Sequence, residues 1–200
     1  MPYEHDGEMK REPFKNTFIS TQALTRTYAN LGAIEIADEY VELHILDADH
    51  PRVIGTIKAK KEGGEQSNRV IFSLRFKTAH TLVKVPDSVQ ELSIVQVDKV
   101  SIDREFQSFG IASYAYSLLA KRGFTILSDT SQFMDGKMLW KQMATRAHLN
   151  SYKIYVLDDE YGFKEVNGVP IIYDGSNIDD SKIWTAGADM GGQHILLMMK

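Results

Sequence analysis

Residues 95–129 restrict the fold more than any other part of the chain. They begin with VQVDKVSID, whose alternating apolar residues are typical of a strand, and they end with TILSD, which is short, apolar and β-branched like a buried parallel strand. Between these runs, IASYAYSLLAKRGF repeats apolar residues at helical spacing up to Gly123, a residue that commonly ends helices. We therefore expect a strand, a turn, a helix and a second strand, in this order.

The first of these strands changes the phase of its apolar residues. Val95 and Val97 fall on odd positions, whereas Val100 and Ile102 fall on even ones. One strand can keep both pairs on the same face only if an extra residue lies between them, and a β-bulge supplies that residue. The sequence predicts a bulge near Asp98-Lys99, with the alternative that the strand has one solvated face and ends there.

The turn before the helix reads Gln107-x-x-Gly110-x-Ala112. A small residue at a helix N-terminus lets a phosphate approach the free N–H groups of the first turn. The spacing resembles the Gln/Arg-x-x-Gly-x-Gly/Ala pattern of the GNAT superfamily of N-acetyltransferases, and Val100 and Ile102 match the residues that close the cofactor-binding strand of that family. The alternative is that Gly110 only opens a helix in another α/β domain.

The resemblance covers about thirty-five residues, and outside them only the order of elements agrees. Downstream, Ser128-Asp129 is followed by Gly136-Lys137 and Trp140, which is similar to a phage-encoded GNAT-like subgroup. The resemblance implies an α/β (α+β) fold with a mixed, mostly antiparallel central sheet, a splayed and bulged cofactor strand and flanking helices. We expect one domain over residues 1–200, with a polar segment at 1–15 and a long loop at 174–193.

Other elements are predicted from periodicity and turn residues. Residues 20–32 and 136–147 are typical of helices, the first with Ser20 or Thr21 as its N-cap and Gly32 as its C-cap. Residues 39–48, 53–61 and 69–77 predict an antiparallel meander. In its third strand one face is assigned to Val70, Phe72, Leu74 and Phe76. Further strands are expected at 153–163, 169–174 and 194–200.

The resemblance also implies a cofactor, acetyl-CoA (coenzyme A), held by the strand and the turn. The residues implied to bind it are Val100, Ser101, Ile102, Gln107, Ser108, Phe109, Gly110, Ile111, Ala112 and Ser113. Phe109 departs from the family pattern, which often has Lys, Arg or Gly there. A basic side chain such as Arg104 or Lys121 could supply the missing charge.

The reaction implied is transfer of an acetyl group to a primary amine by direct attack in a ternary complex. A backbone N–H around Lys99 to Ser101 would hold the developing oxyanion. The carboxylate candidates for the base are Asp129, at the end of the second strand, and Asp98, at the bulge. The helix 136–147 lacks the tyrosine of the family, so Tyr152 is the downstream candidate, together with Tyr155. Asp129 has the alternative role of a turn or capping residue.

Composition limits the other classes of protein. With 200 residues and 43% hydrophobic content, the chain can bury a core, and it contains no apolar run of the length of a membrane helix. The start is polar without a secretion signal, and no cysteine is present, so we expect a cytoplasmic protein without disulfides. The histidines have no metal-binding spacing, so no metal site is predicted.

Charge is distributed unevenly. Residues 58–84 hold seven basic and two acidic residues, a balance of +5, whereas residues 151–200 hold four basic and eight acidic residues, a balance of −4. A basic surface can bind nucleic acid, although a solvated hairpin face has the same composition. Besides the N-acyltransferase, two interpretations therefore stay open: a non-catalytic CoA-binding module and a nucleic-acid-modifying acyltransferase. The partner expected first is an amine acceptor, and no membrane partner is expected.

Overall fold

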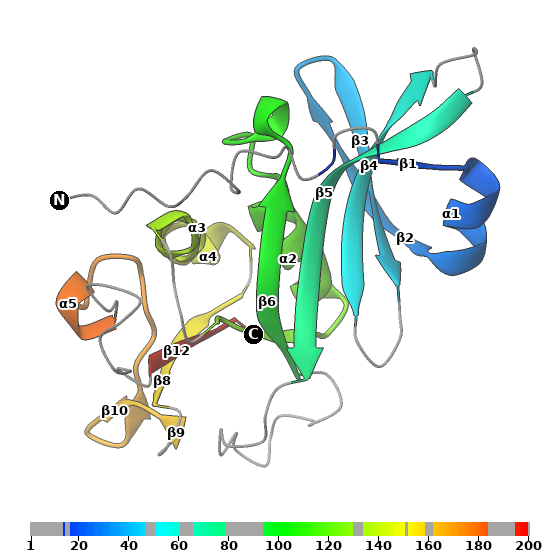
Figure 1. Ribbon diagram of the computed structural model, residues 1–200. Helices are drawn as coiled ribbons and strands as arrows, with labels where there is room; N and C mark the ends of the chain where they lie inside the picture. Colours follow the sequence, from blue (N-terminus) through cyan, green and yellow to red (C-terminus); the bar gives the residue numbers. More distant parts are fainter. Residues whose placement is uncertain are drawn as a thin grey trace, which may run out of the picture.

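The computed structural model describes residue 14 and residues 17–46, 51–60, 66–78, 94–129, 134–150, 152–158, 162–183 and 195–199. The chain has a mixed α+β fold with a mostly antiparallel central sheet and few helices (Figure 1). Among the described residues, no helix combines the length and the apolar character that crossing a membrane requires.

Ten of the described strands form one sheet, in the order β2-β3-β4-β5-β6-β7-β12-β8-β9, with β1 paired to β5. The first five span Phe18–Ile19 (β1), Ala29–Ile36 (β2), Glu39–Leu46 (β3), Arg52–Lys60 (β4) and Gln66–Thr78 (β5). The others span Ile94–Ile102 (β6), Thr125–Leu127 (β7), Ile154–Asp158 (β8), Gly162–Phe163 (β9) and Ile195–Met199 (β12). Among these strands only β6 and β7 pair in parallel. A separate hairpin joins β10, Glu165–Val166, to β11, Val169–Pro170.

Helices cover both faces of the sheet. Helices α2, Ile111–Lys121, and α3, Met134–Thr145, pack on one face and enclose the largest apolar core, with α2 behind β5 and β6 in Figure 1. On the other face, α1, Thr21–Thr27, covers a small cluster near β1 and β4. A third cluster joins β7, β8 and β12 through Leu127, Leu157 and Met198. Two short helices complete the fold, α4 at Ala147–Asn150 and α5 at Asp180–Ile183.

The predicted meander is confirmed as β3, β4 and β5, but the assignment of faces in β5 was wrong at one residue. The pairing of β4 with β5 shifts between Gly55 and Thr56, which face Phe72 and Val70, so Ile71 is an extra residue. This bulge turns Val70 toward the α1 side, while Ile71 and Phe72 lie in the main core. All three are buried, which explains why consecutive apolar residues occur here.

The first helix is shorter than predicted. Ser20 is its N-cap, as expected, and its Oγ accepts a hydrogen bond from the Ala23 N–H at 3.2 Å. The helix ends at Thr27, so Gly32 is not a C-cap but lies in β2, where the register with β3 shifts. A Cβ on Gly32 would lie 2.8 Å from Leu118 Cδ1, because α2 packs closely on β2 at this point. Gly32 is therefore a packing residue.

The C-terminal predictions were correct in part. The expected strands at 153–163 and 194–200 are present as β8 with β9 and as β12. The run at 169–174 forms only the two-residue β11 and one isolated bridge from Ile172 to Tyr155. The expected loop at 174–193 contains α5, and residues 184–194 lie outside the described part, as do residues 1–13 and 15 of the polar segment.

Candidate functional site

The predicted bulge in β6 is confirmed. In the pairing of β5 with β6, Arg75 faces Lys99 and Phe76 faces Val97, so Asp98 has no residue opposite it. The inserted residue restores the apolar phase, because Val95 and Val97 are buried in the main core and Val100 and Ile102 pack against it. The bulge therefore lets β6 present one apolar face along its whole length.

Beyond the bulge, β6 pairs with a single strand, β5, among the described residues. Its parallel pairing with β7 is restricted to Ile94–Gln96 and Thr125–Leu127. The Asp103 N–H bonds to Ile71 O of β5 at 2.7 Å, and backbone groups alternate in direction along a strand. Val100 and Ile102 therefore direct their N–H and C=O groups away from β5, where no described strand pairs with them. We call these backbone groups the open edge of β6.

The open edge leads into the turn before α2 through a 3-10 helix at Arg104–Phe106. Ser108 and Gly110 both have positive φ, 67° and 80°. The first helical bond runs from the Tyr114 N–H to Gly110 O at 2.9 Å, so the N–H groups of residues 111–113 have no acceptor within the helix. A Cβ added to Gly110 would meet no atom within 4 Å. The turn thus contains N–H groups without a helical acceptor, and Gly110 has open space where a side chain would lie.

The side chains of the turn divide into exposed and buried ones. Gln107, Ser108 and Phe109 are exposed, whereas Ile111 and Ala112 are buried in the main core and could reach a ligand through their main chain alone. The Gln107 amide donates to Ile102 O at 3.5 Å, a long hydrogen bond that links the turn to the end of β6.

Two ion pairs fix the segment that joins the open edge to the turn. Arg69 of β5 contacts Asp103 at 2.6 Å and Glu105 at 3.3 Å. Asp103 is almost completely buried, and Phe106 is buried beside it. A buried carboxylate needs such a partner, so the position of the turn depends on Arg69. Arg104 is exposed near the turn, whereas Lys121 lies at the other end of α2, about 15 Å away for an 11-residue helix.

Polar side chains gather where β7 ends. Asp129 pairs with Lys77 of β5 at 2.9 Å, and the Gln96 amide donates to Ser128 O at 3.1 Å. Lys77 lies opposite Gln96 in the sheet, so both side chains are on the face away from α2. We call Lys77, Gln96, Ser128 and Asp129 the open-edge cluster. Sequence reasoning selected Asp129 and missed Lys77 and Gln96.

Asp98, the second carboxylate candidate, is close to this cluster. It pairs with Arg75 at 3.1 Å, and Arg75 is two residues from Lys77 on β5, so both ion pairs lie on one face. Tyr116 of α2 is buried, and burial first and the charge of Asp129 second raise the pKa of its hydroxyl, which keeps the phenol protonated. The structure thus brings Asp98 and Asp129 to one region and adds a neutral phenol influenced by Asp129.

Tyr152, the third candidate, lies elsewhere. Its side chain is buried in the main core, and its hydroxyl donates to Met143 O in α3 at 3.3 Å. Burial raises the pKa of this hydroxyl, while hydrogen bonding to Ser117 lowers it. The hydroxyl hydrogen is thus held by the backbone of α3.

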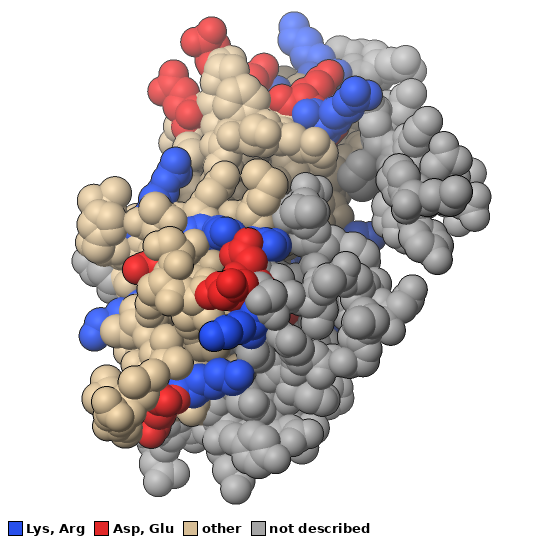
Figure 2. Space-filling view, turned by 90° about the vertical axis from the view of Figure 1, so that its left-hand side faces the viewer, with Lys and Arg blue, Asp and Glu red and all other residues tan. Residues whose placement is uncertain are grey.

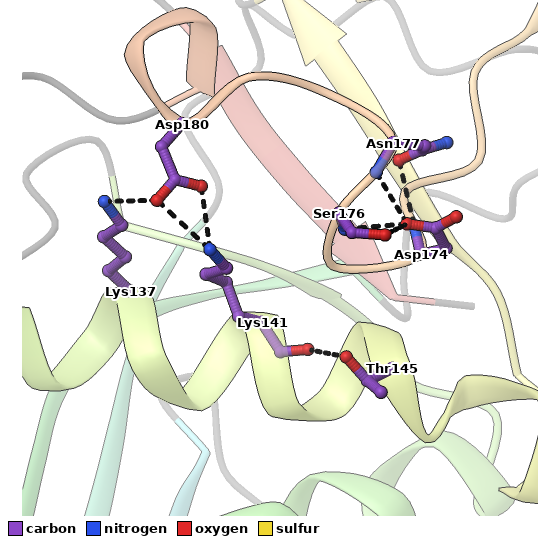
Figure 3. A network of polar contacts seen from close by, with 7 residues as sticks. All are labelled: Lys137, Lys141, Thr145, Asp174, Ser176, Asn177 and Asp180. Atoms are coloured by element: carbon purple, nitrogen blue, oxygen red, sulfur yellow. Dashed lines mark hydrogen bonds and ion pairs between the residues drawn. The ribbon is translucent and has the colours of Figure 1, made fainter.

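A second polar network attaches the C-terminal segment to α3 (Figure 3). Asp180 forms ion pairs with Lys137 and Lys141, each at 2.9 Å, and these lysines lower the pKa of its carboxyl. Asp174 accepts backbone N–H bonds from Ser176 and Asn177, which lower the pKa of Asp174 and close a tight turn. This network explains the docking of residues 174–183, and it includes the Lys137 of the Gly-Lys sequence.

Of the five basic residues that the structure describes between 58 and 84, three pair with carboxylates, while Lys58 bonds to an amide and Lys60 is exposed. Arg69, Arg75 and Lys77 pair with carboxylates from β6, the turn and the end of β7, and Lys58 donates to Asn68 Oδ1 at 3.0 Å. Lys61 and Lys84 lie outside the described residues. On the face with α5 and the β10–β11 hairpin, Figure 2 shows acidic and basic side chains interspersed. These ion pairs reduce the support for a nucleic-acid surface.

Comparison of the chain with protein-family models and with curated proteins gave no match. Within the described ranges, no group of three or more His, Asp or Glu side chains is placed to hold a metal ion. The features of this chain that bear on its function are therefore the open edge, the turn and the open-edge cluster.

Proposed function

We propose that this chain is a GNAT-like N-acyltransferase that binds acetyl-CoA along the open edge of β6 and at the turn before α2. The observation that carries the proposal is the continuity of these two features, because backbone groups of β6 without a strand partner are followed, after a short 3-10 helix, by helix N-terminal N–H groups without a helical acceptor. The ligand must offer both an amide-containing extended arm and a diphosphate. Coenzyme A has this combination, with two amides in its pantetheine arm.

The residues present fit this ligand. The N–H groups of residues 108–113 would hold the diphosphate, since the positive end of the helix dipole lies there and Gly110 leaves the approach open. The groups of Val100 and Ile102 would pair with the amides of the arm, as an added strand pairs with a sheet edge. Phe109 supplies no charge, so the main chain performs the phosphate binding.

The chain would promote acyl transfer through two groups. Acetyl-CoA, when bound, would supply a thioester carbonyl that a neutral amine can attack, with a C–N bond forming and the C–S bond breaking to release the thiolate. An alkylammonium has a pKa of about 10.4, so Asp129 accepts its proton, directly or through water. The Val100 N–H, directed away from β5, is the donor for the carbonyl oxygen. As the amide forms, the amine nitrogen loses a second proton and the leaving thiolate takes up one, so these two balance through solvent, and no proton is required from Tyr116, which is buried and whose raised pKa makes it a weak acid.

A non-catalytic CoA-binding module is the second candidate. Two observations favour it: the Tyr152 hydroxyl is bonded within the core, and Lys77 already pairs with Asp129. Release of free thiol from acetyl-CoA in the presence of a panel of primary amines separates the two candidates. Amine-dependent release supports the transferase, and binding without release supports the module.

The two ends of α2 provide a matched test of cofactor binding. Gly110 and Gly123 have similar φ, 80° and 89°, and an added Cβ meets nothing within 4 Å at either residue. Gly110→Leu and Gly123→Leu should each lose about 1–2 kcal/mol of unfolding free energy from the left-handed backbone. Only Gly110→Leu should lower coenzyme A affinity, by about a hundredfold, in a calorimetric titration. Equal affinities in the two variants would exclude the turn as the diphosphate site.

A further inference from the structure

Three cations lie next to one another on the face of the sheet away from α2, across the neighbouring strands β4, β5 and β6 (Figure 1). Arg52 is directly opposite Arg75, and Arg75 is directly opposite Lys99. Residues in such a position share one face, with their Cβ atoms about 5 Å apart. Their sequence neighbours Val53 and Leu74 are buried in the main core, so the cations point the other way, and all three are exposed. We call these three residues the cation row.

The cation row is unfavourable for the sheet by itself, because like charges directly opposite each other destabilise a pair of strands. Arg75 has one ion pair, with Asp98 at 3.1 Å. Arg52 donates to the Ser73 hydroxyl at 3.3 Å, and Lys99 has no carboxylate partner among the residues that the structure describes. The other two cations of β5 both pair with carboxylates. The row is therefore an exception in this sheet, with a charge balance of +2 when Asp98 is included.

We propose that the cation row binds a phosphate group, and that this group belongs to the acyl acceptor, which is then a primary amine that carries a phosphate. A phosphate monoester has a charge between about −1.5 and −2 at pH 7, which matches the balance of the row, whereas one carboxylate would neutralise only half of it. The two guanidinium groups can each donate two parallel hydrogen bonds to phosphate oxygens. A bound phosphate thus replaces the repulsion between the cations by attraction.

The place of the row assigns the phosphate to the acceptor, an assignment that rests on the proposed function. Lys99 immediately precedes Val100, the proposed donor to the thioester carbonyl. Lys77 lies two residues from Arg75, about 7 Å along β5, and pairs with the proposed base Asp129. A phosphate on the row therefore places the amine of a short acceptor near both groups. The C–N bond forms as the C–S bond breaks, and the phosphate keeps all its bonds.

Binding of inorganic phosphate tests the row without any acyl donor. The titrations use a Gly110→Leu background, so that phosphate at the turn before α2 does not contribute, and chloride buffers of equal ionic strength. Calorimetry should give a dissociation constant of about 1 mM, and Arg52→Gln should weaken binding by about tenfold. No phosphate binding in the parent, or equal binding after Arg52→Gln, would overturn the proposal. Lys99→Gln serves the same comparison if Arg52→Gln does not fold.

Lys60 provides the matched control. It is also an exposed cation of β4 and lies on the same face as Arg52, but it is opposite Gln66 and not opposite a cation. Lys60→Gln should bind phosphate like the parent. Equal weakening in this variant would mean that net charge alone decides binding. A single-stranded oligonucleotide that binds more tightly than phosphate, and that both substitutions weaken, would indicate an extended basic surface and would contradict a site for one phosphate group.

Two amines that differ by the phosphate group, 3-aminopropyl phosphate and propylamine, test the acceptor. In thiol release from acetyl-CoA, the wild type should show at least about fiftyfold higher kcat/KM for the phosphorylated amine. Arg52→Gln should lose most of this preference through a higher KM, and Lys60→Gln should keep it. Equal use of the two amines by the wild type would mean that the row does not bind the acceptor. If no amine gives thiol release, the proposed function fails, while the phosphate titration still decides whether the row binds phosphate.

Discussion

Two polar clusters in this sheet, each built partly of buried residues, contain similar side chains but differ in the backbone around them. The open-edge cluster contains a lysine, an amide, a hydroxyl and a carboxylate. A second cluster, here called the meander cluster, consists of His44, Thr56, Lys58 and Asn68. In it the His44 ring contacts Thr56 Oγ1 at 3.3 Å, and Lys58 bonds to Asn68. On side-chain chemistry alone, either cluster could be a functional site.

The backbone distinguishes them. The strands under the meander cluster pair along their length, with β4 joined to β5 from Arg52 to Lys60, so the cluster only stabilises a continuous sheet. The open-edge cluster lies where pairing stops, next to backbone groups that have no strand partner. In addition, Thr56 and Glu42 both approach His44 at Nε2, so they cannot relay a proton through the two ring nitrogens. A polar cluster is therefore the better candidate for a functional site where the main-chain pairing beside it stops.

The largest expected difference between the clusters is in turnover. Asp129→Asn removes the proposed base, so amine-dependent thiol release should fall by about a hundredfold or more, while coenzyme A affinity stays within about twofold. His44→Asn, the corresponding change in the meander cluster, should leave turnover nearly unchanged. Steady-state kinetics and titration of both variants check this. Unchanged turnover in Asp129→Asn would remove Asp129 as the base, and equal losses in both would remove the distinction.

The next effect is on stability, and it should be larger in the meander cluster. Asn68 bonds to Ile19 O, Thr21 Oγ1 and Lys58 Nζ, so Asn68→Leu leaves three groups without this partner and should cost about 2–3 kcal/mol of unfolding free energy. Gln96→Met removes one hydrogen bond, to Ser128 O, and should cost less, about 1 kcal/mol. Urea unfolding measures both. A larger loss for Gln96→Met would contradict this order of the two clusters.

The sequence predicted the features that change the spacing of apolar residues along a strand. The bulge at Asp98 separates two pairs of valine and isoleucine positions, so the change in their spacing could be read from the sequence. The bulge at Ile71 was missed because Val70, Ile71 and Phe72 are all apolar, and a continuous run has no phase to interrupt. Alternation therefore reports a bulge only where the strand has one polar face.

The open-edge cluster could be predicted only in part for a different reason. Asp129 was selected because it ends a strand, but its partner Lys77 lies 52 residues away, and Gln96 lies 32 residues from Ser128. Such contacts depend on strand order, which local periodicity does not define. Lys77 was assigned to a solvated basic face for the same reason. The one available signal was that Gln96 is polar in the middle of an apolar strand.

The smallest expected effect is the pH dependence that His44 gives to stability. Burial lowers the pKa of His44 below its ordinary 6.5, the charge of Lys58 lowers it further, and Glu42 opposes both. The folded protein therefore prefers neutral His44, and the unfolded chain binds more protons as the pH falls below 6.5. The stabilisation is complete above the unfolded value and is lost as the pH falls through the folded one.

Melting temperatures between about pH 7.5 and about pH 5 check this contribution. The wild type should lose more stability on acidification than His44→Gln, which cannot be protonated and keeps a polar group near Thr56. Asp129→Asn is the matched change in the open-edge cluster, and its curve should keep the wild-type slope, because this variant retains His44. Parallel curves for the wild type and His44→Gln would mean that His44 is protonated equally in the folded and unfolded chains, and the meander cluster would then have no role in pH sensitivity.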